Sequence, residues 1–207
     1  MHARSSTIAA QASSIDKGIA CLRRQVLPEM SALDGWVGLS LMLERSTGRC
    51  IATSAWESEE AMHACDTHVR PLRNSLSAAL DGRTQKIEEW EVAVMHRDHL
   101  AGERACTRCV WLQTDPAGID RVIDTFKSYS LPELEKVEGF RSASLFVNRA
   151  TGRAVGSSVW SSIEELEGSR DAAARMRPKA AEQMRADIIE VAEFRLAFAH
   201  LRVPELV

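Results

Sequence analysis

Histidine is the side chain best suited to move a proton near neutral pH, and the chain contains six of them. His68 lies in a segment of helical periodicity, three residues after Cys65 and four before Leu72, at the edge of an apolar stripe. It could point into a pocket as a ligand or general base, or it could be capped by a neighbouring backbone group or exposed. With these alternatives open, His68 is our candidate for a catalytic residue.

Four other residues have the spacing of metal ligands. His96, His99, Cys106 and Cys109 form the pattern H-x2-H-x6-C-x2-C, which superficially resembles a zinc site. A structural zinc needs ligands that converge tetrahedrally, whereas two residues three apart on a strand point to opposite faces. We therefore predict no metal, unless Cys106 lies in a turn.

An internal repeat determines where these residues lie. When the chain is shifted by 104 positions, residues 4–56 align with residues 108–160 without a gap, and 16 of the 53 positions are identical. The copies then slip by three residues, because Arg70-Pro71 matches Arg177-Pro178, and they return to register at His96 and His200.

Each copy contains the same series of predicted elements. In the first, residues 4–11 form a strand, and a helix follows that Leu27-Pro28-Glu29 interrupts, because proline disfavours helical geometry in the residue before it. The alternation of residues 36–45 predicts a second strand, and Gly48 suits a hairpin turn. A third strand, a second helix and a fourth strand follow at residues 50–56, 57–80 and 87–96.

The order βαββαβ is the ferredoxin-like plan, in which two helices cover one face of an antiparallel sheet. The other face needs a cover, and a second copy of the sheet supplies one. We therefore predict an α+β fold of two ferredoxin-like repeats, residues 1–100 and 101–207, packed sheet to sheet as a single-chain pseudo-dimeric barrel.

Strand alternation also separates two faces in each sheet. Leu39, Leu41 and Leu43 are predicted to face the helices, as are Ala143, Leu145 and Val147. We assign the alternate positions to the barrel interior. In copy one they are Thr7, Ser40, Met42, Glu91 and Met95, and in copy two they are Trp111, Ser144, Phe146, Arg195 and Ala197.

These interior positions predict the ligand site. Glu91 and Arg195 carry opposite charges at equivalent positions, so they could pair, bind opposite ends of a polar ligand, or reach solvent. Trp111 replaces Thr7 and fills copy two, so we expect the pocket in copy one. The predicted ligand-binding residues are Thr7, Ser40, Met42, Glu91, Met95 and Arg195, with His68 nearby.

Two sets of short runs, one set in each copy, then resemble a known family. They are Leu131-Pro132-Glu133-Leu134, Glu138-Gly139-Phe140-Arg141, Arg149-Ala150-Thr151-Gly152-Arg153 and Val159-Trp160 in copy two, and their counterparts from Leu27-Pro28-Glu29 to Trp56 in copy one. They resemble the antibiotic-biosynthesis-monooxygenase-like branch of the dimeric α/β barrels. Proteins of this kind include cofactor-independent quinol or anthrone monooxygenases, haem-degrading enzymes and proteins without an assigned reaction.

The resemblance does not extend to the haem-degrading residues. Those members use an Asn on the first strand with a Trp and a His on the second helix. Residues 4–11 and 108–115 contain no Asn, and the second helix of copy one contains His63 and His68 but no Trp. We therefore predict no haem and no other cofactor.

Composition narrows the remaining classes of function. A net charge of −3 and a pI near 6.1 provide no basic surface for nucleic acid, and no apolar run is long enough to span a membrane. The N-terminus leads into no apolar segment of a secretory signal, and five cysteines fit a reducing compartment, so we expect a cytoplasmic protein. A further homodimer of the fused chain stays open.

Three functions are compatible with this reading. The first is a protein of unknown reaction that binds a small apolar or aromatic molecule between the two sheets. The second is a cofactor-independent monooxygenase of a phenolic or quinol substrate, with His68 as its base. The third is a structural or interaction module without an open pocket.

Overall fold

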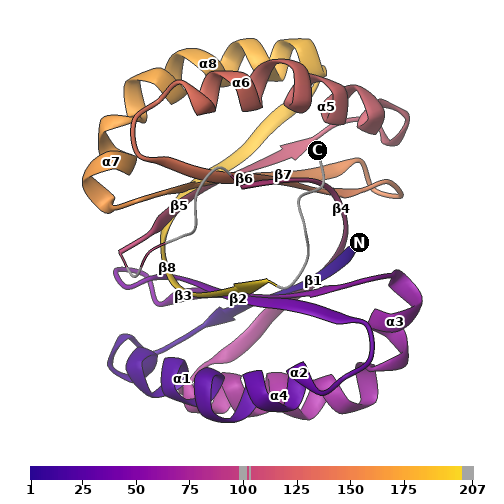
Figure 1. Ribbon diagram of the computed structural model, residues 1–207, viewed down its shortest axis with the longest axis vertical. Helices are drawn as coiled ribbons and strands as arrows, with labels where there is room; N and C mark the ends of the chain where they lie inside the picture. The colour runs from indigo at the N-terminus through magenta and orange to yellow at the C-terminus, as the bar shows by residue number, and fades with distance from the viewer. Residues whose placement is uncertain (98–101, 103, 202–207) are drawn as a thin grey trace. The chain divides into compact units, whose positions relative to one another are not determined.

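The computed structural model of the protein describes residues 1–97, 102 and 104–201. Within these residues the first copy consists of β1 (His2–Ala9), η1 (Ala12–Ser14), α1 (Ile15–Cys21), η2 (Leu22–Val26), α2 (Leu27–Ser31), β2 (Trp36–Glu44), β3 (Arg49–Trp56), α3 (Glu59–Ala64), α4 (Asp66–Ala79) and β4 (Arg83–Arg97) (Figure 1). The second consists of β5 (Cys106–Gln113), η3 (Pro116–Gly118), α5 (Ile119–Thr125), η4 (Phe126–Ser130), α6 (Leu131–Glu135), β6 (Phe140–Asn148), β7 (Arg153–Trp160), α7 (Ile163–Gly168), α8 (Arg170–Met184) and β8 (Asp187–Leu201).

Residue contacts divide the chain into two units, each built mainly from one copy. Unit 1 contains Met1–Trp90 and the end of β8 from Leu196, and unit 2 contains Glu91–Arg195. The strand order is β4-β1-β3-β2-β8 in unit 1 and β8-β5-β7-β6-β4 in unit 2. Because β4 and β8 serve both units, the hydrogen-bonded order closes on itself, which confirms the predicted α+β barrel of two fused ferredoxin-like repeats.

The unit boundaries differ from a division of the sequence into residues 1–100 and 101–207. Both β4 and β8 are 15 residues long, so the predicted strand at 87–96 is only part of β4. The second half of β4, from Glu91, pairs with β6 inside unit 2. A strand this long can begin in the sheet of one repeat and end in the sheet of the other.

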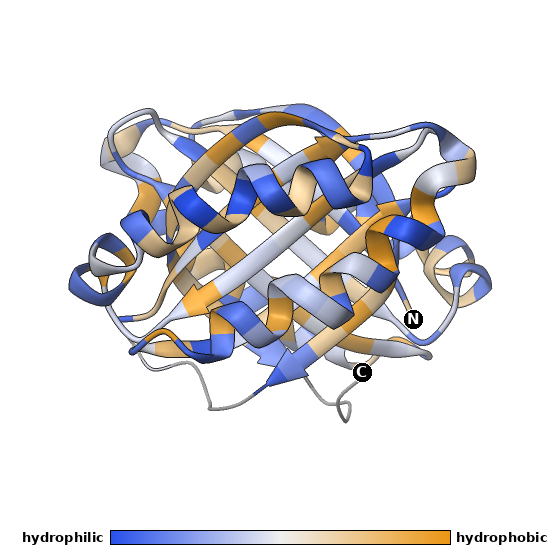
Figure 2. Cartoon of the chain, turned by 90° about the horizontal axis from the view of Figure 1, so that it is seen from above, coloured by the Kyte–Doolittle hydropathy of each residue, from blue (hydrophilic) through white to orange (hydrophobic). Residues whose placement is uncertain are grey.

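In each unit one face of the sheet packs against helices and encloses an apolar core (Figure 1). The predicted helix-facing side chains are in these cores: Leu39, Leu41, Leu43, Ala143, Leu145 and Val147 are all at most 5% exposed. Figure 2 shows hydrophilic and hydrophobic residues alternating around the helices, as expected for helices with one face on a sheet. Burial of these side chains is the main favourable contribution to each unit.

The first helix of each copy continues through its proline, contrary to the predicted interruption. A π-helical turn, η2, precedes Pro28, and the Leu27 N–H donates to the carbonyl of Leu22, five residues back. Proline has no N–H and crowds the carbonyl four residues before it in an α-helix. The wider turn changes the hydrogen-bond pattern just before Pro28, so the helix extends to Ser31. The same arrangement recurs at Pro132.

The second helix of each copy keeps the 104-residue register, so the predicted three-residue slip does not occur. Helix α4 begins at Asp66 and α8 begins at Arg170, and the following strands β4 and β8 also begin 104 positions apart. Pro71 and Pro178 therefore lie one helical turn apart in their helices and are not equivalent. The residue equivalent to Arg177 is Arg73.

Candidate functional site

A pocket lies inside unit 2, between its sheet and its helices. Strands β5, β7 and β8 form one wall, and η4, α6 and α8 form the other. The cavity has a volume of about 70 Å³, well above the requirement of a single buried water. Its apolar lining includes Val110, Leu112, Phe126, Leu134, Met176 and Met184.

The pocket is open at two positions of α8 that carry smaller side chains than their equivalents in α4. Ala173 takes the place of Val69, and Ala180 takes the place of Leu76. Val69 and Leu76 are each 3% exposed, and both belong to the apolar core of unit 1. Smaller buried side chains leave a cavity wherever the surroundings cannot collapse. In unit 2 such a cavity lies beside Ala173 and Ala180.

One substitution between the copies runs in the opposite direction. Phe126 replaces Leu22, and its ring lies against Gly156, where a Cβ would approach Phe126 Cε2 to 3.3 Å. Glycine at this position therefore gives the larger ring room. The ring forms part of the pocket wall and leaves the space beside Ala173 and Ala180 open.

Arg108 provides a charged group at the pocket, although its side chain is only 3% exposed. Its Nε and Nη2 donate to Glu193 Oε1 at 2.9 and 2.7 Å, Nη1 donates to Ser169 Oγ at 2.9 Å, and Nη2 donates to the Leu166 carbonyl at 2.9 Å. A buried guanidinium needs such partners, because an unpaired buried charge is costly. These bonds fix Arg108 between β5 and the helices.

The carboxylate of Glu193 is shared between arginines. Although burial alone would raise the pKa of Glu193, hydrogen bonds from Arg170 and Arg108 lower it below its usual value. Arg170 Nη2 lies 2.7 Å from Glu193 Oε2, on the more exposed side of this cluster. Glu193 is therefore held in its ionised form.

The equivalent cluster in unit 1 contains a second acid. Arg4 donates to Glu89 and to Asp66, and Asp66 Oδ1 also accepts from Arg73 Nη1 and Nη2 at 3.3 Å. A hydrogen bond from Arg70 is the main reason that the pKa of Asp66 lies below its usual value, and this outweighs the opposing effect of burial. In unit 1, the two arginines equivalent to Arg108 and Arg177 thus share Asp66.

Unit 2 has lost this acid, because Arg170 occupies the position of Asp66. Arg177, the equivalent of Arg73, lines the pocket and is half-buried. Among the residues that the structure describes, none forms a hydrogen bond or ion pair with Arg177. Burial, followed by the charge of Arg108, lowers the pKa of Arg177 below its usual value.

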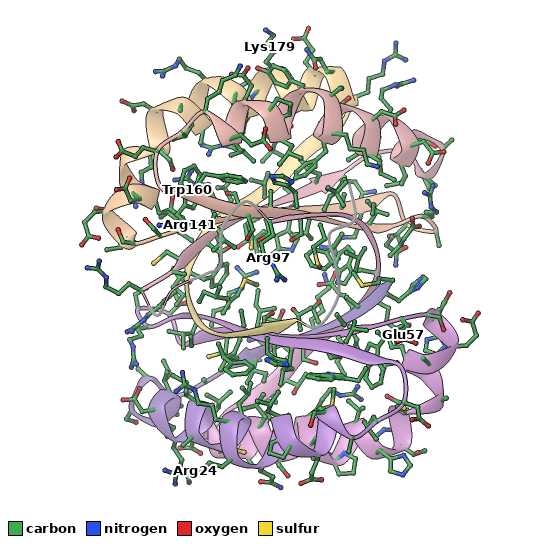
Figure 3. The ribbon with its side chains drawn as sticks, viewed as in Figure 1. Arg24, Glu57, Arg97, Arg141, Trp160 and Lys179 are labelled. Atoms are coloured by element: carbon green, nitrogen blue, oxygen red, sulfur yellow. The ribbon has the colours of Figure 1, made fainter. Side chains whose placement is uncertain are left out.

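Lys179, two residues after Arg177 in α8, has a different environment from Arg177. Figure 3 shows Lys179 pointing away from the sheet, on the outer side of the helix. Its Nζ lies 5.2 Å from the centroid of the Tyr129 ring, a cation–π contact on the surface. The direction of the side chain thus separates Lys179 from Arg177, which faces the pocket.

Three of the predicted ligand-binding residues are brought together on one face of the unit 1 sheet. Thr7 and Met42 both pair with Ile51, one from each neighbouring strand, and Ser40 pairs with Thr53 two residues further along β3. Cross-strand partners share a face, so Thr7, Ser40 and Met42 lie side by side, opposite the helices. Their role in binding stays a prediction.

Glu91 does not lie on the face to which we assigned it. It pairs with Val147, whereas Met95 pairs with Ser144, and residues 144 and 147 of β6 point to opposite faces. A bulge between Val92 and Val94 shifts the alternation within β4, so Glu91 faces the helices while Met95 faces away from them.

Glu91 forms its ion pair with Arg149 and not with Arg195. Arg149 Nε lies 2.6 Å from Glu91 Oε2, and Arg149 Nη1 lies 2.7 Å from Asp120 Oδ1. Arg195 is exposed and pairs in register with Cys106, which belongs to the helix-side core. The assignment of both charged residues to the sheet face opposite the helices was therefore wrong, and any contact with a ligand stays a prediction.

His68 is exposed on α4, and its Nδ1 lies 3.5 Å from the hydroxyl of Thr67. The buried residue next to it on the helix is Val69, which faces the unit 1 core. The structure thus realises the exposed alternative for His68. Its catalytic role stays a prediction without support from this position.

The residues with metal-ligand spacing are dispersed. Cys106 and Cys109 both lie in β5, and a separation of three places their sulfurs on opposite faces. His99 lies outside the described residues. His96 stacks on Phe140, with ring centroids 6.3 Å apart, and the equivalent His200 stacks on Trp36 at 5.8 Å. The two stacked pairs occupy equivalent positions in the two copies.

The sequence contained a signal for the pocket that the assumed slip concealed. With a constant shift of 104, Val69 and Leu76 align with Ala173 and Ala180, and Asp66 aligns with Arg170. The pair Arg70-Pro71 and Arg177-Pro178 lies 107 positions apart, three residues out of this register, so it conceals these equivalences. Among the described residues, no helix is long and apolar enough to cross a membrane.

Comparison with solved structures supports the fold. A candidate monooxygenase from Lactobacillus acidophilus NCFM matches with a TM-score of 0.71 and 10% identity, over 100% of this chain and 99% of that one. A ferredoxin-fold protein related to antibiotic biosynthesis monooxygenases, from Listeria monocytogenes 4b F2365, matches with a TM-score of 0.52 and 9% identity over 95% of each chain. At such identities the likeness shows the fold alone, and it confirms the predicted resemblance to monooxygenase-like α+β barrels.

Comparison of sequences defines the family more narrowly. No model of a known protein family matches the chain. The chain is 45% identical over 207 residues to the uncharacterized protein Rv2557 of Mycobacterium tuberculosis strain H37Rv. The match covers 100% of this chain and 92% of that protein. The chain therefore belongs to the family of Rv2557, and its own fold is that of the monooxygenase-like α+β barrels, with both halves in one chain.

Proposed function

We propose that this protein binds a small, mostly apolar molecule in the pocket of unit 2. The observation that carries the proposal is the cavity beside Ala173 and Ala180, where the other copy is filled by Val69 and Leu76. Protein interiors are normally close-packed, and an unfilled cavity lowers stability. The void in unit 2 gives an apolar group space that the homologous core of unit 1 does not offer.

The polar side chains of the pocket favour binding over oxygenation. A cofactor-independent monooxygenase needs a base within hydrogen-bond reach of its substrate. Among the described lining residues, the polar side chains are Arg108, Arg177, Ser130, Ser157 and Ser158. Near neutral pH arginines and serines donate hydrogen bonds and do not readily take up a proton. Binding is therefore the function that this pocket supports best.

The test is a titration of the full chain with neutral aromatic alcohols: benzyl alcohol, hydrocinnamyl alcohol and naphthol. Calorimetry should detect binding of at least one of them. Ala173→Leu adds a branched side chain inside the cavity, so it should weaken that binding at least about tenfold, which corresponds to about 1.4 kcal/mol.

Ala174→Leu is the matched control, because Ala174 is exposed on the same helix and does not line the pocket. It should leave the affinity unchanged. Equal affinities in wild type and Ala173→Leu would contradict the proposed function.

A further inference from the structure

Arg177 is the least satisfied charged group of the pocket. In unit 1 its equivalent, Arg73, lies 3.3 Å from the carboxylate of Asp66. In unit 2 the position of Asp66 is held by Arg170, which is bound to Glu193 and Glu167. The change has therefore removed a carboxylate from the neighbourhood of Arg177 and left the arginine in place.

Arg108 has hydrogen-bond acceptors even though unit 2 has no equivalent of Asp66. Where Arg4 Nη1 donates to Asp66 Oδ1 at 2.8 Å, Arg108 Nη1 donates to the neutral Ser169 Oγ at 2.9 Å. The buried arginine of unit 2 thus keeps a full set of acceptors. Arg177 faces the cavity without a hydrogen bond or ion pair to any described residue, and the attraction of the Glu193 carboxylate does not offset its burial.

A half-buried guanidinium next to an apolar cavity favours a particular chemistry in its ligand. Arginine donates two parallel hydrogen bonds to a carboxylate, and such charge-assisted bonds are stronger in a partly desolvated site. The rest of the lining is apolar, which suits a hydrocarbon or aromatic group. In unit 2 the position without a carboxylate and the open volume lie in the same helix-covered layer.

We propose that the molecule bound in this pocket is a small amphipathic carboxylate, whose anionic head is held by Arg177 and whose apolar part fills the space beside Ala173 and Ala180. The ligand's carboxylate takes the role that Asp66 has in unit 1. This inference rests on the proposed function and specifies the class of ligand.

The experiment compares two probes with the same skeleton, hydrocinnamate and hydrocinnamyl alcohol, in calorimetric titrations of the full chain near neutral pH. The acid should bind at least about tenfold more tightly than the alcohol, since hydrogen bonds to charged groups contribute that much. Arg177→Gln should abolish this preference by lowering the affinity for the acid to about that for the alcohol. Arg175→Gln, at an exposed residue of the same helix, should preserve it.

A second variant tests the same idea by restoring the acid of unit 1. Arg170→Asp introduces a carboxylate at the position equivalent to Asp66, where it should pair with Arg177 and compete with the ligand's head. Affinity for hydrocinnamate should fall about tenfold, and affinity for the alcohol should not. Circular dichroism of each variant verifies that it is folded.

The outcomes separate this inference from the proposed function. If the alcohol binds, Ala173→Leu weakens it, and the acid binds no more tightly, the pocket binds neutral molecules and the carboxylate is excluded. A preference for the acid that survives both Arg177→Gln and Arg170→Asp also overturns the inference. If neither probe binds, the proposed function fails and this inference fails with it.

Discussion

The two helix-covered layers of this molecule have the same frame and different contents. In unit 1 large aliphatic side chains from α4 fill the space over the sheet, and an acid neutralises the neighbouring arginines. In unit 2 the same helix positions carry alanine, and an arginine replaces the acid. Size and charge have thus changed together in one copy. A duplicated core allows this, because unit 1 can retain a packed, charge-balanced layer while unit 2 gains a cavity.

The largest effect is expected from giving unit 1 the content of unit 2. Leu76→Ala removes a side chain that is 3% exposed and should lower the free energy of unfolding by about 2–5 kcal/mol. Urea denaturation followed by circular dichroism measures it. Asn74→Ala, at an exposed position of α4, is the control and should cost less than about 0.5 kcal/mol. A similarly small loss for Leu76→Ala would show that unit 1 tolerates a cavity as well as unit 2 does.

A smaller effect is expected from removing the acid that distinguishes the two clusters. The pKa of Asp66 is lowered in the folded protein, chiefly by the hydrogen bond from Arg70. Such a carboxyl adds stability above its unfolded pKa and loses it as the pH falls through the folded pKa. Asp66→Asn should therefore lower the free energy of unfolding by about 1–3 kcal/mol near neutral pH. This loss should become smaller when the pH falls below 3.8, the usual pKa of an aspartate.

Urea denaturation at a series of pH values measures this dependence. Asp16→Asn is the matched control, because Asp16 also pairs with an arginine, Arg45, but its side chain is 81% exposed. An exposed pair contributes little, so this control should change stability by less than about 1 kcal/mol at any pH. A loss for Asp66→Asn that is the same at every pH would show that its charge is not the reason for the effect.

The smallest effect is expected from filling unit 2. Ala180→Leu restores the side chain of Leu76 and should raise the free energy of unfolding by about 0.5–2 kcal/mol, as cavity-filling substitutions commonly do. The midpoint of thermal unfolding should rise accordingly. Ala174→Leu, on the exposed side of α8, should leave it unchanged. A marked loss of stability for Ala180→Leu would mean that the cavity cannot accept the added side chain.

The fold could be predicted from the sequence because its signals are periodic and repeated. Leu39, Leu41 and Leu43 recur at every second position, and the same period of two recurs in the second copy. Gly48 marks the hairpin, and its φ of +73° is a backbone conformation that glycine adopts without strain. Two agreeing copies identify the elements more securely than either copy alone.

The site could not be predicted in the same way, because single residues determine it. The bulge between Val92 and Val94 reverses the faces of β4 and leaves no periodic mark in the sequence, so Glu91 was assigned to the wrong face. The π-helical turn before Pro28 allows a helix to continue where proline alone predicts its end. The role of Arg177 depends on which residue neighbours it in space. In the constant register of 104, Arg170 stands at the position of Asp66, so no acid is there to pair with Arg177.

The division of β8 between the units has a consequence for biosynthesis. The sheet of unit 1 is completed by the end of β8 from Leu196, which lies beside β2 although five strands, β3 to β7, separate the two in sequence. During translation β1 to β4 therefore emerge from the ribosome before β8, and β2 remains an unprotected edge until β8 has been synthesised. Such edges are prone to associate with other chains. Nascent chains of this protein should thus depend on chaperones more than their early, regular secondary structure would suggest.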